Sequence, residues 1–208
     1  MTKRYALISD GTSDRVLLKI IDWTFYHFLN LETSGERADF YYSKTKPQSI
    51  SEKVELVIEQ YDDLDFIVIH RDAERETYEK RVEEIEKELT LIKNQSLTSI
   101  PVIPVRMTEA WLLFDSKAIA SASGNPNLPD LPALPPLNTV ETLRDPKSLL
   151  EKLIKDSCGL RSRGLKKLNT RHCIQLIPDF VEDFSPLLTI PSYQRFKQKI
   201  LEVFDSPN

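Results

Sequence analysis

Residues 65–74, with the sequence DFIVIHRDAE, combine an unbroken apolar run with two carboxylates spaced one residue apart. An apolar run of this kind is typical of a central parallel strand that is buried on both faces. In open α/β sheets, ligands bind at the carboxyl ends of such strands. Two interpretations of Asp72 and Glu74 are therefore open. They belong to a functional site, or they cap or charge the first turn of the acid-rich helix that follows.

Strand-like and helix-like segments alternate on both sides of this stretch. This alternation predicts an α/β fold, in which a mainly parallel, Rossmann-like sheet of four strands is flanked by helices. The other strands are expected at residues 5–9, 38–42 and 100–105, and the helices at 14–30, 51–61, 74–93 and from 108 onward.

The rest of the chain predicts an addition to this α/β domain, which we place at residues 1–122. Residues 123–145 contain five closely spaced prolines and are expected to form a surface excursion. Residues 146–208 are expected to be a helical C-terminal extension packed on the same domain, with helices at 146–155 and 193–204.

Composition indicates a water-soluble protein. The chain has 208 residues, of which 40% are hydrophobic and 29% charged. It contains no apolar run near the roughly 20 residues that a membrane-spanning helix needs. Its two cysteines, Cys158 and Cys173, are too few and too far apart for a zinc knuckle or a disulfide framework. We expect a cytoplasmic protein with reduced cysteines and no membrane contact.

Positive charge is concentrated in one segment, although the formal net charge is −4. Residues 161–172 carry five basic side chains and no acidic one. Such a segment is suited to binding phosphates, as in nucleic acids, but it is equally typical of a solvated helix face. The candidate nucleic-acid-binding residues are Arg163, Lys166, Lys167 and Arg171.

Acidic residues follow three of the predicted strands. Asp10 follows the first strand, Asp72 and Glu74 the third, and Glu109 the fourth. In a parallel sheet these points converge on one edge, and the motifs hold few cationic residues that would offset the repulsion between the carboxylates. Mg²⁺ prefers oxygen ligands and usually takes one or two protein carboxylates, with waters and substrate phosphates completing its shell. This pattern predicts a Mg²⁺ or Mn²⁺ site and metal-assisted phosphoryl chemistry.

Several other classes are excluded because their motifs are missing. The sequence has no Gly-x-x-x-x-Gly-Lys-Ser/Thr loop, no dinucleotide-binding glycine fingerprint and no Gly-x-Ser-x-Gly elbow. It therefore has no recognisable ATP-binding motif of its own. His70 directly precedes the acidic pair, so it is a candidate supporting or catalytic group.

Four segments resemble those of a known family. LISDGTSD at residues 7–14 resembles the Val-Glu-Gly-x-x-Asp signature of Toprim domains, and IVIHRDAE at 67–74 resembles their Asp-x-Asp strand end. MTEAWLLFD at 107–115 and the basic C-terminal stretch at 162–187 are similar to the small bacterial Toprim-like proteins grouped as DUF4276.

The resemblance implies roles for particular residues. The general acid/base glutamate of Toprim domains falls on Asp10, and their Mg²⁺-binding pair falls on Asp72 and Glu74. Asp10 is one methylene shorter than the family's glutamate, and Glu74 is one longer than the family's aspartate. Glu109 would complete the acidic cluster. The second-sphere residues that would support it are Asp14, His70 and Arg71.

The resemblance also implies a function. It suggests a metal-dependent nuclease acting on DNA or RNA, an effector in a phage-defence module that works with an AAA or ABC-type ATPase, with homodimerisation as a further expectation. The alternative is a catalytically inactive Toprim-shaped subunit that binds and regulates such an ATPase, which the shortened acid at position 10 favours.

Overall fold

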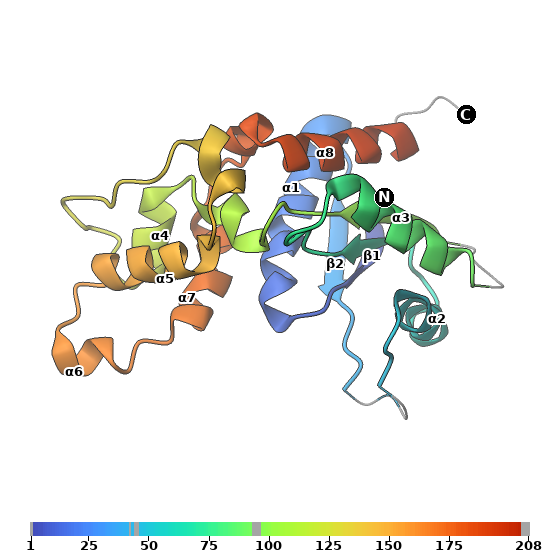
Figure 1. Ribbon diagram of the computed structural model, residues 1–208, viewed down its shortest axis with the longest axis horizontal. Helices are drawn as coiled ribbons and strands as arrows, with labels where there is room; N and C mark the ends of the chain where they lie inside the picture. Colours follow the sequence, from blue (N-terminus) through green and yellow to red (C-terminus); the bar gives the residue numbers. More distant parts are fainter. Residues whose placement is uncertain (1, 42, 44–45, 93–96, 205–208) are drawn as a thin grey trace. The chain divides into compact units, whose positions relative to one another are not determined.

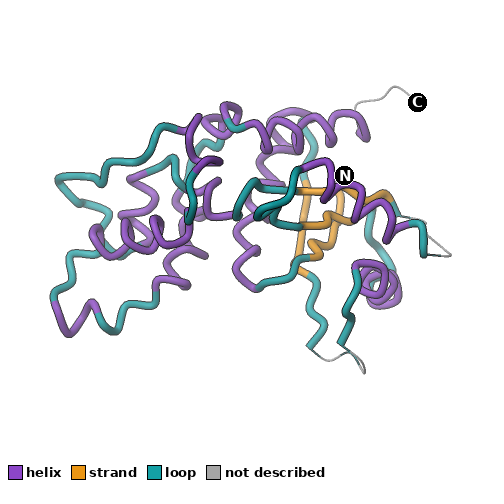
Figure 2. The backbone as a smooth tube through the Cα atoms, viewed as in Figure 1, coloured by secondary structure: helices purple, strands orange, loops and turns teal. Residues whose placement is uncertain are grey.

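The computed structural model describes residues 2–41, 43, 46–92 and 97–204 of the chain (Figure 1). The chain divides into two compact units. The first unit comprises residues 1–103 and 195–208, and the second comprises residues 104–194. In the part of the chain that is described, all strands belong to the first unit (Figure 2).

The sheet of the first unit has four strands in the order β2-β1-β3-β4. Every pairing between neighbouring strands is parallel, with Tyr5 opposite Phe66 and Ile8 opposite Ile69 in the two central strands. The predicted α/β class with a parallel four-stranded sheet is confirmed. The strands are β1 (Lys3–Ile8), β2 (Thr33–Arg37), β3 (Phe66–His70) and β4 (Thr98–Val102).

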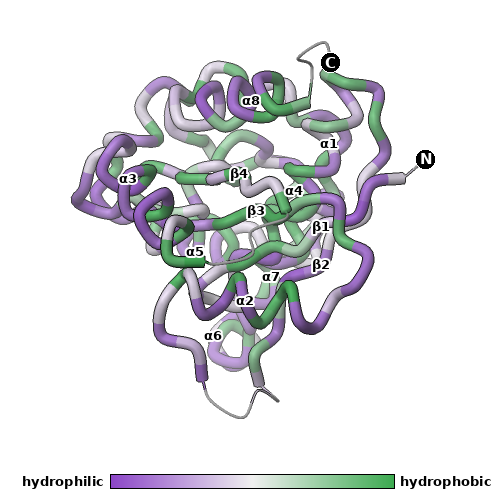
Figure 3. The backbone as a smooth tube through the Cα atoms, turned by 90° about the vertical axis from the view of Figure 1, so that its right-hand side faces the viewer, coloured by the Kyte–Doolittle hydropathy of each residue, from purple (hydrophilic) through white to green (hydrophobic). Residues whose placement is uncertain are grey.

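Strand β3 is buried along its whole length, as its apolar sequence predicts. Figure 3 shows the hydrophobic character of this strand in green. Ile67 and Ile69 belong to a core cluster that also includes residues of α2 (Ile50–Gln60) and α3 (Tyr78–Leu89). On the other face, the ring of Phe66 lies 5.0 Å from that of Phe25 and 5.2 Å from that of Phe204. Because successive side chains of a strand alternate between faces, β3 contributes to the hydrophobic packing on both faces of the sheet.

Side-chain caps set the start of two helices of the first unit, α2 and α3, whereas α1 (Leu17–Leu29) has none. Helix α1 follows a short 3-10 helix, η1 (Thr12–Val16). Ser49 caps α2 by accepting the backbone N–H of Glu52, whose side chain reaches back to the cap. Helix α8 (Pro191–Phe204) carries Phe204 at its end. The predicted helices at 14–30, 51–61 and 193–204 are confirmed, with small shifts in their ends.

The second strand was predicted wrongly. Residues 38–41 are not part of any strand, and residue 42 lies outside the described residues; β2 occupies Thr33–Arg37 instead. Its sequence, TSGER, is polar because β2 is an edge strand whose residues are half-buried or exposed. Gly35 is needed there, since a Cβ at this position would lie 2.0 Å from the ring of Tyr5.

Two later elements also differ from the prediction. Helix α3 starts at Tyr78 rather than at Glu74, because the Thr77 side chain caps it by accepting the N–H of Lys80. Residue 93, the predicted end of this helix, lies outside the described residues. Strand β4 ends at Val102, before Pro104, and not at residue 105.

The second unit is built from short helices and loops. Its η2 helix (Thr108–Leu112) is a 3-10 helix that includes Trp111, which is fully buried and donates its Nε1–H to Ser192 Oγ at 3.0 Å. The proline-rich residues 125–136 form turns and loops, and α5 (Pro146–Ser157) confirms the predicted helix at 146–155. The remaining helices are α4 (Ser116–Ala122), η3 (Leu137–Thr142), α6 (Ser162–Leu165), α7 (Thr170–Leu176), η4 (Ile177–Phe180) and η5 (Ser185–Thr189).

Within the ranges that the structure describes, no helix combines the length and the apolar character needed to cross a membrane.

Candidate functional site

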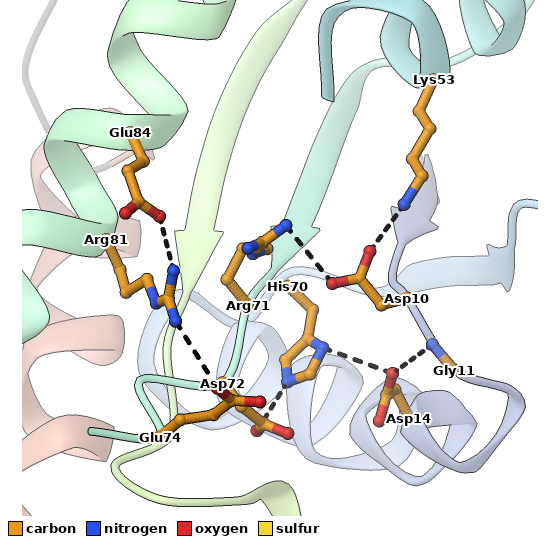
Figure 4. A network of polar contacts seen from close by, with 10 residues as sticks. All are labelled: Asp10, Gly11, Asp14, Lys53, His70, Arg71, Asp72, Glu74, Arg81 and Glu84. Atoms are coloured by element: carbon orange, nitrogen blue, oxygen red, sulfur yellow. Dashed lines mark hydrogen bonds and ion pairs between the residues drawn. The ribbon is translucent and has the colours of Figure 1, made fainter. Parts of the chain in front are cut away.

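A polar pocket lies at the carboxyl edge of the sheet, the side on which the parallel strands end. Its volume is about 320 Å³. The loops that follow the two central strands, β1 and β3, provide most of its wall, and Arg81 of α3 closes one side (Figure 4). Its lining residues are Asp10, Gly11, Ser13, Asp14, His70, Arg71, Asp72, Glu74 and Arg81.

The loop after β1 folds back on itself. The Gly11 backbone N–H donates to Asp14 Oδ2 at 3.0 Å, and the Ser9 hydroxyl donates to the Gly11 carbonyl at 3.0 Å. These bonds turn the Asp14 carboxylate inward, where Asp14 is only 6% exposed. Asp14 therefore forms part of the pocket floor.

His70, the last residue of β3, connects this loop with the loop after β3. Its imidazole is 3% exposed, with Nδ1 3.4 Å from Asp14 Oδ2 and Nε2 3.2 Å from Asp72 Oδ1 (Figure 4). Burial lowers the pKa of His70, but the two carboxylates outweigh this and raise it from 6.5 to about 9. At neutral pH His70 is therefore an imidazolium held between two aspartates.

The same contact acts on Asp14. Burial raises the pKa of the Asp14 carboxyl, but the proximity and charge of His70 together with the Gly11 amide outweigh this, so the pKa lies below its ordinary value. Asp14 is thus a permanent counter-ion of His70, in line with the supporting role expected for both residues.

Asp10 occupies the mouth of the pocket and faces two cations. Its Oδ1 lies 2.6 Å from Nζ of Lys53, and its Oδ2 lies 3.4 Å from an Nη of Arg71. The Asp10 side chain is 57% exposed, whereas that of Lys53 is only 14% exposed. One accessible carboxylate thus bridges two basic groups that come from α2 and from the loop after β3.

Glu74 has an unusual backbone conformation, with a φ of 54°. This left-handed region is costly for a residue with a side chain other than asparagine or aspartate. Glu74 lies within the loop that contains Asp72, and its carboxylate is 3.8 Å from Arg81, which also binds Glu84 at 2.7 Å. Helix α3 is capped by Thr77, so neither Asp72 nor Glu74 caps it, and the helix-capping interpretation of these two residues is wrong.

The structure corrects the expected repulsion among the carboxylates. Each acid that lines the pocket lies against a basic side chain: Asp10 against Lys53 and Arg71, Asp14 and Asp72 against His70, and Glu74 against Arg81. The cluster is therefore electrostatically balanced by the protein's own cations. Repulsion between the acids is not an argument for a metal.

The residues nevertheless fit a hard cation by their chemistry. Asp10, Asp72 and Glu74 present carboxylate oxygens to one pocket, and their side chains are 57%, 28% and 68% exposed, so a hydrated ion has access to them. Among the described residues, no three or more His, Cys, Asp or Glu side chains are arranged to hold a metal ion. Mg²⁺ does not require such a cage, because it is commonly bound through one or two carboxylates together with waters and substrate phosphates.

The other predicted site residues belong to the second unit. Glu109 is 7% exposed and lies in η2, with its Oε1 4.0 Å from Nζ of Lys147. The side chains proposed to bind nucleic acid lie in and around α6 and at the start of α7, and all are exposed: Arg163, Lys166, Lys167 and Arg171. Exposure agrees with either interpretation of the basic segment.

Two cations of the site were missed from the sequence: Arg81, which lines the pocket, and Lys53, which binds Asp10. Both lie in the first two turns of helices, α2 and α3. In a parallel α/β fold, a helix that leads into the next strand begins near the carboxyl edge of the sheet. Basic residues in such first turns were therefore the signal that could have identified them.

No protein-family model matches the chain, and no curated protein sequence is significantly similar to it.

Proposed function

We propose that the protein is a metal-dependent nuclease of the Toprim type. The observation that supports this most is the meeting of Asp10, Asp72 and Glu74 with Arg71 and Arg81 in one pocket at the carboxyl edge of a parallel sheet. Carboxylates suit a hard cation, and guanidinium groups suit phosphate oxygens. The hydrolysis of a phosphodiester can use both a bound cation and guanidinium groups.

In this proposal Asp72 and Glu74 hold Mg²⁺ or Mn²⁺. A bound divalent cation would stabilise the negative charge that develops on the phosphodiester during hydrolysis. His70 keeps the Asp72 carboxylate in place through its contact at 3.2 Å, with Asp14 as its second counter-ion. Asp10 would take up or give back a proton once it is released from Lys53 and Arg71.

The proposal also assigns the basic segment and the partner. Arg163, Lys166, Lys167 and Arg171 are exposed and would contact the phosphate backbone of DNA or RNA, which makes binding sensitive to salt. The sequence has no ATP-binding motif, so nucleotide control would come from an AAA or ABC-type ATPase partner.

The test is a cleavage assay. The protein, alone and with a candidate ATPase, is incubated with DNA, RNA and tRNA in Mg²⁺, in Mn²⁺ or in a chelator. We expect cleavage only with the metal, and we expect Asp72→Ala and Glu74→Ala to abolish it, because each removes a proposed ligand. Calorimetric titration with Mn²⁺ should show weakened metal binding in the same variants.

The matched control is Asp65→Ala. Asp65 also forms a Lys–Asp ion pair of 2.6 Å, but it precedes β3 rather than following it. This variant should cleave at the wild-type rate. Metal-independent cleavage, or full activity in both Asp72→Ala and Glu74→Ala, contradicts the nuclease mechanism.

A second candidate is a non-catalytic subunit that binds and regulates an ATPase. The observation that favours it is the pairing of every pocket carboxylate with a basic side chain, which lets the cluster act as structural bracing. In that case the ATPase would bind equally well to wild type and to Asp72→Ala, and no nucleic acid would be cut.

A further inference from the structure

The contacts of Asp10 define an anion-binding site in the pocket mouth. Lys53 and Arg71 approach one carboxylate from two different elements, with one oxygen held by each cation at 2.6 and 3.4 Å. Basic side chains bind a phosphate in the same way, with each cation contacting one of two non-bridging oxygens.

Exposure distinguishes the anion from its cations. The Asp10 side chain is 57% exposed, but Lys53 is 14% and Arg71 is 31% exposed. Arg71 thus lines the pocket and Lys53 reaches Asp10 from α2, and both cations are less exposed than the carboxylate that they share. An external anion can reach this site by displacing the exposed carboxylate of Asp10.

Arg71 extends the site beyond this pocket. It lines the pocket that contains Asp72, and it also lines a neighbouring cavity of about 360 Å³ formed by the start of α2 and by residues of α3, including Lys87. A chain of phosphates passing through the first pocket would therefore meet one further basic group in the second, Lys87, next to the carboxylates of Glu84 and Glu88.

We propose that Lys53 and Arg71 receive a phosphate of the substrate strand, and that Asp10 occupies their site until this phosphate displaces it. The assignment of this phosphate to a nucleic-acid strand rests on the proposed nuclease function. The anion-binding site itself rests on the contacts of Asp10 alone. Asp10 is then a placeholder in the resting protein, and its release leaves it free beside the bound phosphate.

The test measures binding in a chelator, so that no cleavage interferes. Fluorescence anisotropy with labelled single- and double-stranded DNA and RNA is compared for wild type, Asp10→Asn, Lys53→Met and Arg71→Met. Asp10→Asn should bind about tenfold more tightly, because the competing anion is gone. Lys53→Met should bind about tenfold more weakly and lower the salt dependence by about one ion.

Matched controls come from the ion pair of Lys3 and Asp65, which has the same Nζ–O distance of 2.6 Å before the first and third strands. Asp65→Asn and Lys3→Met change the net charge by the same amounts and should leave affinity within about twofold, since they lie away from the pocket. An equal gain in Asp10→Asn and Asp65→Asn overturns the proposal, because it reflects overall charge. So does unchanged or weaker binding by Asp10→Asn.

Inorganic phosphate, followed by ³¹P NMR, separates the two proposals. If phosphate binds in a Lys53-dependent way but no nucleic acid does, the anion site is supported, and its assignment to a strand fails together with the nuclease. If nucleic acid is cut but neither Lys53→Met nor Arg71→Met weakens binding, the anion site is overturned and the nuclease stands.

Discussion

Each of the two edges of the sheet has a lysine–aspartate ion pair, but the two pairs lie in different surroundings. At the amino edge, where β1 and β3 begin, Lys3 binds Asp65 at 2.6 Å. At the carboxyl edge, Lys53 binds Asp10 at the same distance, but Arg71 shares the carboxylate, and the pair stands at a pocket with a buried His70 in its floor. An ion pair becomes part of a site when its members share partners and when burial holds them in place.

Removing the buried cation should show the largest difference between the edges. His70→Leu leaves Asp14, which is 6% exposed, without its imidazolium. Loss of one partner of a buried pair typically costs about 3–5 kcal/mol, so urea unfolding should show a decrease of that size in the free energy of unfolding. Lys3→Met breaks a solvent-exposed pair and should cost less than about 1 kcal/mol. Similar losses in the two variants contradict the assignment of His70 as a buried charged bridge.

The pH dependence of stability should follow from the same residue. The pKa of His70 is raised from 6.5 to about 9 in the folded protein, so protonated His70 stabilises the fold fully below about pH 6.5. This stabilisation, about 3 kcal/mol, is lost as the pH rises through about 9. Urea unfolding between pH 6 and 10 should reveal this decline in wild type and in Lys3→Met but not in His70→Leu. A decline of equal size in His70→Leu would assign it to another group.

The smallest expected effect concerns the two lysine–aspartate pairs themselves. Double-mutant cycles with Lys53→Met and Asp10→Asn should give a coupling energy of about 1 kcal/mol, because Lys53 is largely buried. The cycle with Lys3→Met and Asp65→Asn should give less than about 0.5 kcal/mol, as is usual for exposed pairs. Thermal unfolding of the single and double variants gives the two coupling energies, and repeating it at low and high salt shows how far salt screens each pair. A larger coupling at the amino edge would reverse the comparison.

The central strands were predictable from sequence because their side chains carry the signal. An apolar run buried on both faces indicates β3, and acids directly after β1 and β3 place Asp10 and Asp72 at one edge. The edge strand β2 carries no such signal, since its polar residues and Gly35 are selected by the fit of Tyr5 beside them. That contact depends on tertiary structure and cannot be seen in the sequence. The more apolar residues 38–42 were therefore predicted as the second strand.

The partners of the acids were beyond a prediction made from motifs alone. Lys53 and Arg81 lie near the starts of their helices, which places them close to the carboxyl edge, but their contacts with Asp10 and Glu74 depend on how those helices lie on the sheet. Similarly, the left-handed backbone conformation of Glu74 could not be predicted, because the position holds neither glycine nor asparagine, the residues that usually indicate it. The sequence therefore predicted that Asp10, Asp72 and Glu74 lie at one edge of the sheet, but it did not predict the basic side chains that balance their charge.

The parallel pairing of β1 with β3 also has a consequence for folding. Tyr5 lies opposite Phe66, so the two loops that build the pocket meet only after the intervening chain, with α1, β2 and α2, has been closed into a large loop. Contacts of such long sequence separation form late and slow the folding reaction. A ligand that touches both loops would therefore act as a reversible cross-link, slowing global unfolding rather than ordering one loop.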